Sequence, residues 1–139
     1  MTGIYQHSID AKGRLFIPAR LREDLGDVFY VTLSMEEKCL WAFSNESWER
    51  FTEKIKAMPI AKQIKMRPFF SHAAKCELDG QGRILLSQSL RDFRDLKKSV
   101  TVVGAGERAE FWDSEAFAVK DAQETTPENI ADVFTELDI

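Results

Sequence analysis

The sequence predicts an α+β protein with a β-rich, barrel-like core, in which two interlocked β-hairpin repeats are related by pseudo-two-fold symmetry and flanked by short helices. Three observations support this prediction. The chain has 139 residues, of which 44% are hydrophobic, so it can bury a core without disulfide bridges. One turn-and-strand motif occurs twice. The strands of that motif are apolar on both faces, and a lone hairpin cannot cover two faces by itself.

The motif "IDAKGRLFIPARLRE" (9–23) returns as "LDGQGRILLSQSLRD" (78–92), at an offset of 69 residues. The offset continues without a gap, so that Val31 corresponds to Val100. A gapless offset over about 45 positions indicates an internal duplication. The residues that recur are Asp10, Gly13, Arg14, Leu21 and Arg22, as Asp79, Gly82, Arg83, Leu90 and Arg91.

Each copy starts with a tight turn followed by a strand. Aspartate at the first position and glycine at the fourth favour a type I turn, because glycine accepts a positive φ. In the first copy, a strand ending at Ile9 would pair with Arg14–Ile17 as a β-hairpin. In the second, Leu78 would end the strand that pairs with 83–86. We expect the two hairpins to interlock, each completing the core of the other. The residues expected to hold the turns are Asp10, Gly13, Asp79 and Gly82.

A short helix is expected after each hairpin. In the first copy, Pro18 suits the first turn of this helix and Gly26 its end. Ser87 replaces the proline in the second copy and makes the entry less rigid. Two further strands are expected in each half, at 29–33 and 40–43 and at 100–103 and 109–112.

The middle of the chain predicts two helices. Ser44 is expected to cap the first, which has an apolar stripe that packs into the core. The stripe consists of Trp48, Phe51, Ile55 and Met58. A basic helix begins near Ile60, and Pro68 should end or kink it, because proline removes a backbone hydrogen bond.

The C-terminal tail predicts an amphipathic helix. Thr126 can cap it and Pro127 fits its first position. Its apolar stripe consists of Ile130, Val133, Phe134 and Leu137, and the opposite face is acidic. The pattern leaves open whether the tail docks on its own body, docks on a neighbouring subunit or stays mobile.

The chain therefore divides into a first repeat (1–53), a connecting basic helical segment (54–73), a second repeat (74–120) and an acidic amphipathic tail (121–139). Its net charge of −4 at first counts against a nucleic-acid partner. The charges are segregated, however. Residues 121–139 hold six acidic and no basic residues, while 54–75 hold six basic and no acidic ones. Different faces can then present different fields, so polyanion binding stays open, although a basic run is most often a solvated face.

The sequence contains no catalytic motif, and we expect neither an enzyme nor a cofactor. The four potential metal ligands lack zinc-finger spacing, although a metal-dependent enzyme stays an alternative. These ligands are His7, Cys39, His72 and Cys76. With no apolar run near membrane-spanning length and no secretory signal, we expect a cytoplasmic protein with reduced thiols and no membrane partner.

Two interpretations of Arg14 and Arg83 remain. In the first, each arginine pairs with the aspartate four residues before it and contributes only local stability. In the second, the aspartate holds the turn while the arginine faces a partner. A guanidinium fork suits phosphate oxygens or the O6/N7 edge of guanine.

The pattern D-x-x-G-R, an apolar strand, I-P and the short helix "LRE" resembles the hairpin of AbrB-type DNA-binding proteins. Two such copies, with "RPFFSHAAKCELDGQGRI" between them and "VVGAGERAEFW" after them, resemble the MraZ family specifically, from about Gly3 to Phe117. The chain departs from the family pattern at Thr2, where an arginine is common, at Ser87, where a second proline is common, and at Pro68 within the central helix. The first departure would weaken backbone contacts, and the other two would change geometry.

This resemblance implies a DNA-binding transcriptional regulator, usually a repressor, of the bacterial division and cell-wall gene cluster. It implies ring-shaped homo-oligomers that bind short direct repeats in double-stranded DNA upstream of their own operon, in the cytoplasm and at the nucleoid. Arg14 and Arg83 would contact DNA, with Lys12 beside a phosphate. Gln81 replaces Lys12 in the second copy, so the first turn should contribute more. The competing hypothesis is a swapped-hairpin protein-interaction or antitoxin-like module that never touches DNA.

Overall fold

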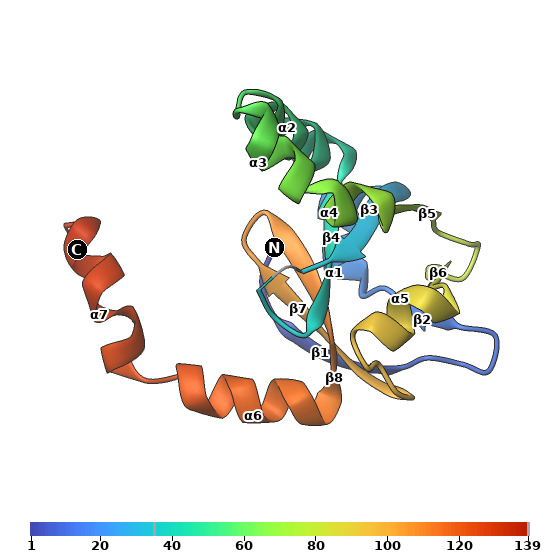
Figure 1. Ribbon diagram of the computed structural model, residues 1–139. Helices are drawn as coiled ribbons and strands as arrows, with labels where there is room; N and C mark the ends of the chain where they lie inside the picture. Colours follow the sequence, from blue (N-terminus) through green and yellow to red (C-terminus); the bar gives the residue numbers. More distant parts are fainter. Residues whose placement is uncertain (35, 139) are drawn as a thin grey trace.

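The computed structural model describes residues 1–34 and 36–138, and it confirms an α+β fold. Within these ranges the strands form a six-stranded antiparallel sheet and a separate two-stranded sheet (Figure 1). The strands are β1 (Ile4–Ser8), β2 (Arg14–Phe16), β3 (Val28–Leu33), β4 (Cys39–Ser44), β5 (Ala74–Glu77), β6 (Arg83–Leu85), β7 (Ser99–Ala105) and β8 (Arg108–Asp113). The helices are α1 (Ala19–Leu25), α2 (Asn45–Lys56), α3 (Ile60–Lys65), α4 (Arg67–Ser71), α5 (Gln88–Phe93), α6 (Ser114–Glu124) and α7 (Pro127–Glu136).

The six-stranded sheet has the same arrangement when it is followed from either edge. Its order is β1-β7-β8-β4-β3-β5. If β1 is matched with β5, β3 with β7 and β4 with β8, the order read from one edge is the same as the order read from the other. At the centre, Trp41 of β4 lies opposite Glu110 of β8, which stands 69 residues later. The pseudo-two-fold axis therefore passes between β4 and β8.

The two-stranded sheet lies on the same pseudo-axis and joins the repeats. Leu15 of β2 lies opposite Ile84 of β6, its own counterpart, and both side chains are buried. Beyond this ladder, the Ile17 N–H donates to the Gly82 carbonyl at 2.9 Å, and the Leu86 N–H donates to the Gly13 carbonyl at 2.9 Å. Each turn is thus fixed to the strand of the other repeat.

This pairing corrects two predictions. The arms of the first turn do not form an extended hairpin, because β1 pairs with β7, and only an isolated bridge joins Ile9 to Leu15. The strands also do not close into a barrel within the described ranges, since no ladder there joins the edge strands β1 and β5. The physical reason is the same in both cases. β2 and β6 use their hydrogen bonds on each other, which leaves the larger sheet open. Leu15 and Ile84 are buried by this pairing, whereas Leu85 on the opposite face of β6 is 63% exposed, so the second apolar face is not covered as predicted.

The predicted gapless offset is wrong at β3 and β7. Tyr5 pairs with Val102, and Ala74, which stands 69 residues after Tyr5, pairs with Val31. Val102, rather than Val100, is therefore the structural counterpart of Val31. Two extra residues lie between α5 and β7, and the tighter β7–β8 turn compensates for them before β8. A shift of two residues leaves each side chain on the same face of the sheet, so the core is preserved.

The core forms where the two repeats meet. Leu15, Ile17, Ile84 and Leu86 are almost completely buried, in one cluster with buried leucines of α1 and α5. An aromatic cluster continues it at the other end, where Phe69 of α4 stacks on Trp48 and contacts Phe43. These aromatic contacts fix the connecting segment onto β3 and β4.

The helix signals in the middle of the chain are confirmed, with one exception. The Ser44 hydroxyl accepts the Ser47 N–H at 3.1 Å and starts α2, and Pro68 lies at the start of α4, where α3 has already ended. Met58 differs from the prediction, because it follows the end of α2 and its side chain is 40% exposed.

The C-terminal helices α6 and α7 lead away from the sheets (Figure 1). The sequence did not predict α6, which Asp113 caps by accepting the Ala116 N–H at 3.4 Å. As predicted, the Thr126 side chain caps α7 and Pro127 starts it. Its apolar stripe is exposed along its whole length, so the tail does not dock on its own body. None of the described helices is both long enough and apolar enough to cross a membrane.

Candidate nucleic-acid interface

Each turn is built around one aspartate carboxylate. Asp10 Oδ1 accepts the N–H groups of Lys12 at 3.0 Å and Arg14 at 2.9 Å, and the Asp10 carbonyl accepts the Gly13 N–H at 3.0 Å. Gly13 takes a φ of 86°, which a residue with a Cβ rarely adopts. The hydrogen bond from the Arg14 backbone, reinforced by the Arg14 side chain and the Lys12 backbone, holds the pKa of Asp10 below its ordinary value.

The second turn repeats this construction. Asp79 Oδ1 accepts the N–H groups of Gln81 at 2.8 Å and Arg83 at 3.0 Å, and Gly82 has a φ of 76°. The backbone hydrogen bond from Arg83 is again the main cause of a lowered Asp79 pKa. Asp79 thus occupies in the second turn the place that Asp10 has in the first, and each carboxylate accepts two backbone N–H groups of its own turn.

The two arginines form the ion pairs that the first interpretation predicts. Arg14 Nε lies 2.6 Å from Asp10 Oδ2, and Arg83 Nε lies 2.9 Å from Asp79 Oδ2. The arginine side chains are still 34% and 26% exposed, respectively. In both pairs the carboxylate engages Nε, and across the described residues neither arginine donates a hydrogen bond from its terminal nitrogens. An arginine held in this way keeps two parallel donors for an external acceptor.

The tips of the turns differ in charge. Lys12 is exposed at the first tip and makes no ion pair in the described chain, and the uncharged Gln81 is exposed at the second. The structure thus brings Lys12 and Arg14 to one turn and Arg83 to the other, as the sequence predicts. The two turns therefore differ in the charge that they expose.

Sequence reasoning missed the role of Arg22 and Arg91. Each packs against the turn glycine of the other repeat: a Cβ on Gly13 would lie 2.8 Å from Arg91 Nη2, and a Cβ on Gly82 would clash with the Arg22 guanidinium. The Arg91 Nε also donates to the Leu86 carbonyl at 3.2 Å. Both arginines recur in the duplication, which was a signal of this role, but their partners become visible only in the fold.

The four potential metal ligands are not assembled into a site. The described residues contain no group of three or more histidine, cysteine, aspartate or glutamate side chains that could hold a metal ion. Cys39 and Cys76 are both buried, and burial raises the pKa of the Cys76 thiol to about 11. These thiols are packing residues in this fold.

Comparison with known proteins identifies the family. A family model described as "MraZ protein, putative antitoxin-like" matches residues 1–67 and 69–132. A protein from Heliobacterium modesticaldum named "Transcriptional regulator MraZ" is 43% identical over 142 residues, covering 99% of this chain and 98% of its own. Proteins of the same name from Carboxydothermus hydrogenoformans and Desulforamulus reducens are 48% and 42% identical, covering 81% and 94% of this chain and 80% and 97% of their own. The chain belongs to the MraZ family.

Proposed function

We propose that the protein is a transcriptional regulator that binds double-stranded DNA through its two turns. The observation that carries this proposal is the way Asp10 and Asp79 hold the arginines. Each carboxylate takes Nε, and within the described structure the terminal nitrogens of Arg14 and Arg83 donate no hydrogen bond, although Arg83 Nη1 lies 3.9 Å from Asp10 Oδ2. The names of the relatives support a role in transcription.

The residues of the turns have distinct roles in this proposal. Arg14 and Arg83 donate to guanine O6/N7 or to phosphate oxygens, because a guanidinium fork matches both acceptors. Lys12 contacts a phosphate next to the first turn. The repeats 1–53 and 74–120 are the two AbrB-like DNA-contacting units, and the first binds more tightly because Gln81 stands where the first has Lys12.

We further propose that several copies assemble into a ring. One subunit offers few cations to DNA, and a ring that places successive turns on direct repeats can add about 10²- to 10⁴-fold avidity without any new contact. Two exposed surfaces support such assembly. The apolar stripe of α7 lies on an acidic helix, and α3 exposes Ile60 and Ile64 among basic residues. The α7 helix of one copy would dock on α3 of the next through this complementary charge and apolar surface.

The target that fits this assembly is a set of short direct repeats upstream of the protein's own operon, in the bacterial division and cell-wall gene cluster. Binding there would repress transcription and place the protein at the nucleoid in the cytoplasm. The acidic tail, which projects away from the sheets (Figure 1), would stay clear of the phosphates.

The test is fluorescence anisotropy of a duplex that carries these repeats, at two salt concentrations. Arg14→Ala/Arg83→Ala should lower the affinity about 30-fold or more, because each bidentate contact contributes about 1–3 kcal/mol. Arg50→Ala/Arg67→Ala removes the same charge from exposed helical positions and should bind nearly as well as the wild type. Light scattering on the same samples checks that the assembly is intact.

Two results would reject DNA binding through the turns. Absence of wild-type binding would do so directly. Equal binding by the wild type and by the folded double variant would leave the arginines as parts of the turns only. Either result would favour the protein-interaction module, for which the four ion-paired turn residues would be structural.

A further inference from the structure

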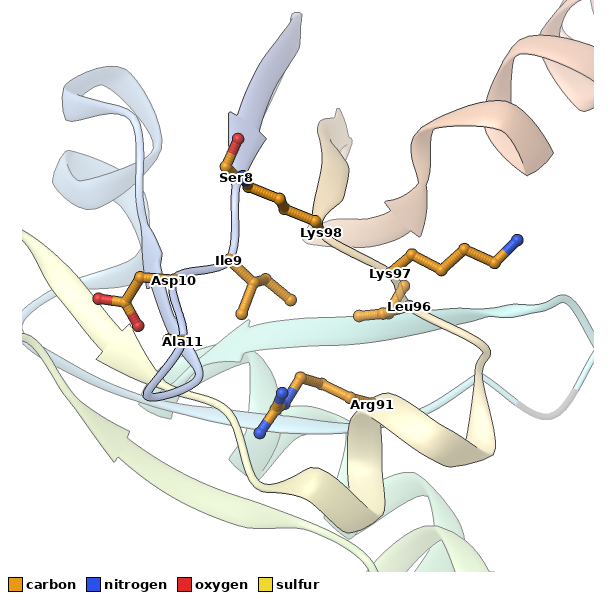
Figure 2. A pocket seen from close by; sticks show the side chains of 8 residues that line it. All are labelled: Ser8, Ile9, Asp10, Ala11, Arg91, Leu96, Lys97 and Lys98. Carbon is orange, nitrogen blue, oxygen red and sulfur yellow. The ribbon is translucent and has the colours of Figure 1, made fainter.

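We infer that a groove beside the first turn binds a phosphate of the DNA backbone and that cations of the second repeat supply this contact. The inference rests on the proposed function and adds a site to it. The groove has a volume of about 710 Å³. The residues that line this first-turn groove are Ser8, Ile9, Asp10, Ala11, Arg91, Leu96, Lys97 and Lys98 (Figure 2).

The floor of the first-turn groove is apolar and its rim is cationic. Ile9 and Leu96 are buried, and their side chains approach each other in Figure 2. The Arg91 side chain points toward the turn, and the Lys98 side chain extends toward Ser8, whereas Lys97 extends away from the turn. The Ile9 N–H donates to the Lys98 carbonyl at 2.8 Å, which fixes the backbone of this lysine beside the start of the turn.

The charge of the groove is not neutralised from within the chain. In the described structure Arg91, Lys97 and Lys98 make no ion pair. The one lining carboxylate, Asp10, points away from the groove in Figure 2 and is already engaged by Arg14 and Arg83. The first-turn groove is therefore left with three cations and no free anion.

The pseudo-symmetric groove beside the second turn shows that this charge is not a by-product of the fold. The Leu78 N–H donates to the Asp27 carbonyl at 2.9 Å, so Asp27 occupies the place that Lys98 has in the first groove. Its lining contains one cation, Arg22, and the acids Glu23, Asp27 and Asp79. The two grooves thus share a backbone frame but carry opposite charge. The extra residues between α5 and β7 carry Lys97 and Lys98 into the first groove.

A backbone phosphate is the ligand that this arrangement fits. The first-turn groove opens beside Ala11, next to the exposed Lys12 and the partly exposed Arg14, so its cations continue the surface proposed to meet DNA. Contacts to phosphate position a protein on the duplex and carry no sequence information directly. We therefore assign base contact to the turn and phosphate contact to the groove beside it.

The experiment compares Lys97→Ala/Lys98→Ala with the wild type in anisotropy titrations across a range of salt concentrations. Removing two cations, each worth about one unit of slope, should reduce the slope of log K against log[salt] by about 2, which corresponds to roughly a 40-fold loss of affinity at 0.15 M salt. The loss should be equal on the repeat-containing duplex and on a scrambled one. Both lysines are exposed, so the thermal melting curve should not change.

Two controls make the comparison specific. Lys54→Ala/Lys56→Ala changes the net charge equally on the exposed end of α2 and should leave the slope near that of the wild type. Lys97→Arg/Lys98→Arg keeps the charge and should restore the slope. An unchanged slope and affinity in Lys97→Ala/Lys98→Ala, with wild-type binding intact, would overturn the groove assignment and leave the proposed function standing.

A free anion such as inorganic phosphate is the alternative occupant of the first-turn groove, because it offers the same oxygens as a DNA phosphate. Inorganic phosphate would then raise the melting temperature of the wild type but not that of Lys97→Ala/Lys98→Ala, while both bind DNA equally. That pair of results would also overturn the assignment. Absence of any wild-type DNA binding would remove the proposed function and this inference together.

Discussion

Arg83 Nη1 lies 3.9 Å from Asp10 Oδ2, so the arginine of one repeat faces the turn carboxylate of the other. Asp10 consequently has two cationic neighbours, Arg14 and Arg83, whereas in the described part of the chain Asp79 forms an ion pair only with Arg83. The two turns are therefore coupled electrostatically as well as through the hydrogen bonds between β2 and β6.

This coupling predicts an unequal response to neutralising the two carboxylates. We expect Asp10→Asn to lower the urea midpoint more than Asp79→Asn does, because it removes a carboxylate that has two arginine neighbours rather than one. Equilibrium urea unfolding followed by circular dichroism measures both. Equal midpoints would show that the contact across the repeats adds nothing to stability.

The turn carboxylates also predict how stability depends on pH. Both aspartates have a folded-state pKa below the ordinary value of 3.8, so their contribution is present above that value and is lost as pH falls through the folded pKa. The free energy of unfolding should therefore decrease below about pH 4. In Asp10→Asn/Asp79→Asn this decrease should be smaller. If the free energy of unfolding fell equally with pH in the wild type and in Asp10→Asn/Asp79→Asn, the turn aspartates would not be its cause.

Gly13 and Gly82 should tolerate no side chain. Both have positive φ, and a Cβ on Gly13 would lie 2.8 Å from the Leu86 carbonyl oxygen. We expect Gly13→Ala to cost about 1–3 kcal/mol of folding stability. Gly80→Ala is the matched control, because a Cβ there meets nothing within 4 Å and the equivalent position of the first turn is already Ala11. It should be neutral or stabilising by up to about 1 kcal/mol.

The apolar stripe of α7 predicts a separation between assembly and folding. Phe134 is 46% exposed and supports no core, so Phe134→Ser should reduce the mass measured by light scattering and leave the subunit's own melting transition in place. Ile60→Ser/Ile64→Ser on α3 should have the same effect, and combining the two should add little. Ala122→Ser, an exposed position on α6, serves as the control. A Phe134→Ser protein with wild-type mass would argue against docking of α7 on a second copy.

The sequence predicts best the features that depend on neighbouring residues. The aspartate and glycine of each turn, the caps at Ser44 and Thr126, and the interruption at Pro68 all act within a few residues, and the structure contains each of them. Their hydrogen bonds are local, so residue type and spacing are sufficient to indicate them.

The features that the sequence does not predict depend on distant partners. The pairing of β2 with β6 instead of β1 is a choice between strands that have the same apolar pattern, and only the complete core decides it. The extra residues before β7 are hidden because a shift of two positions keeps the alternation of buried and exposed side chains. Nothing in the local sequence therefore distinguishes Lys97 and Lys98 from ordinary surface residues, although the fold places them beside the first turn.

The pairing of β2 with β6 has a consequence for how this molecule can evolve. Two separate copies of one repeat could form the same ladder, but any mutation would then appear on both sides at once. Joined in one polypeptide, the halves diverge independently, and Lys98 can stand where the other half keeps Asp27. Fusion thereby makes the two halves of the body distinguishable, whereas the two-fold axis of a dimer of identical chains makes its halves equivalent. In the proposed ring, subunits with unlike halves would meet a run of direct repeats differently in its two directions.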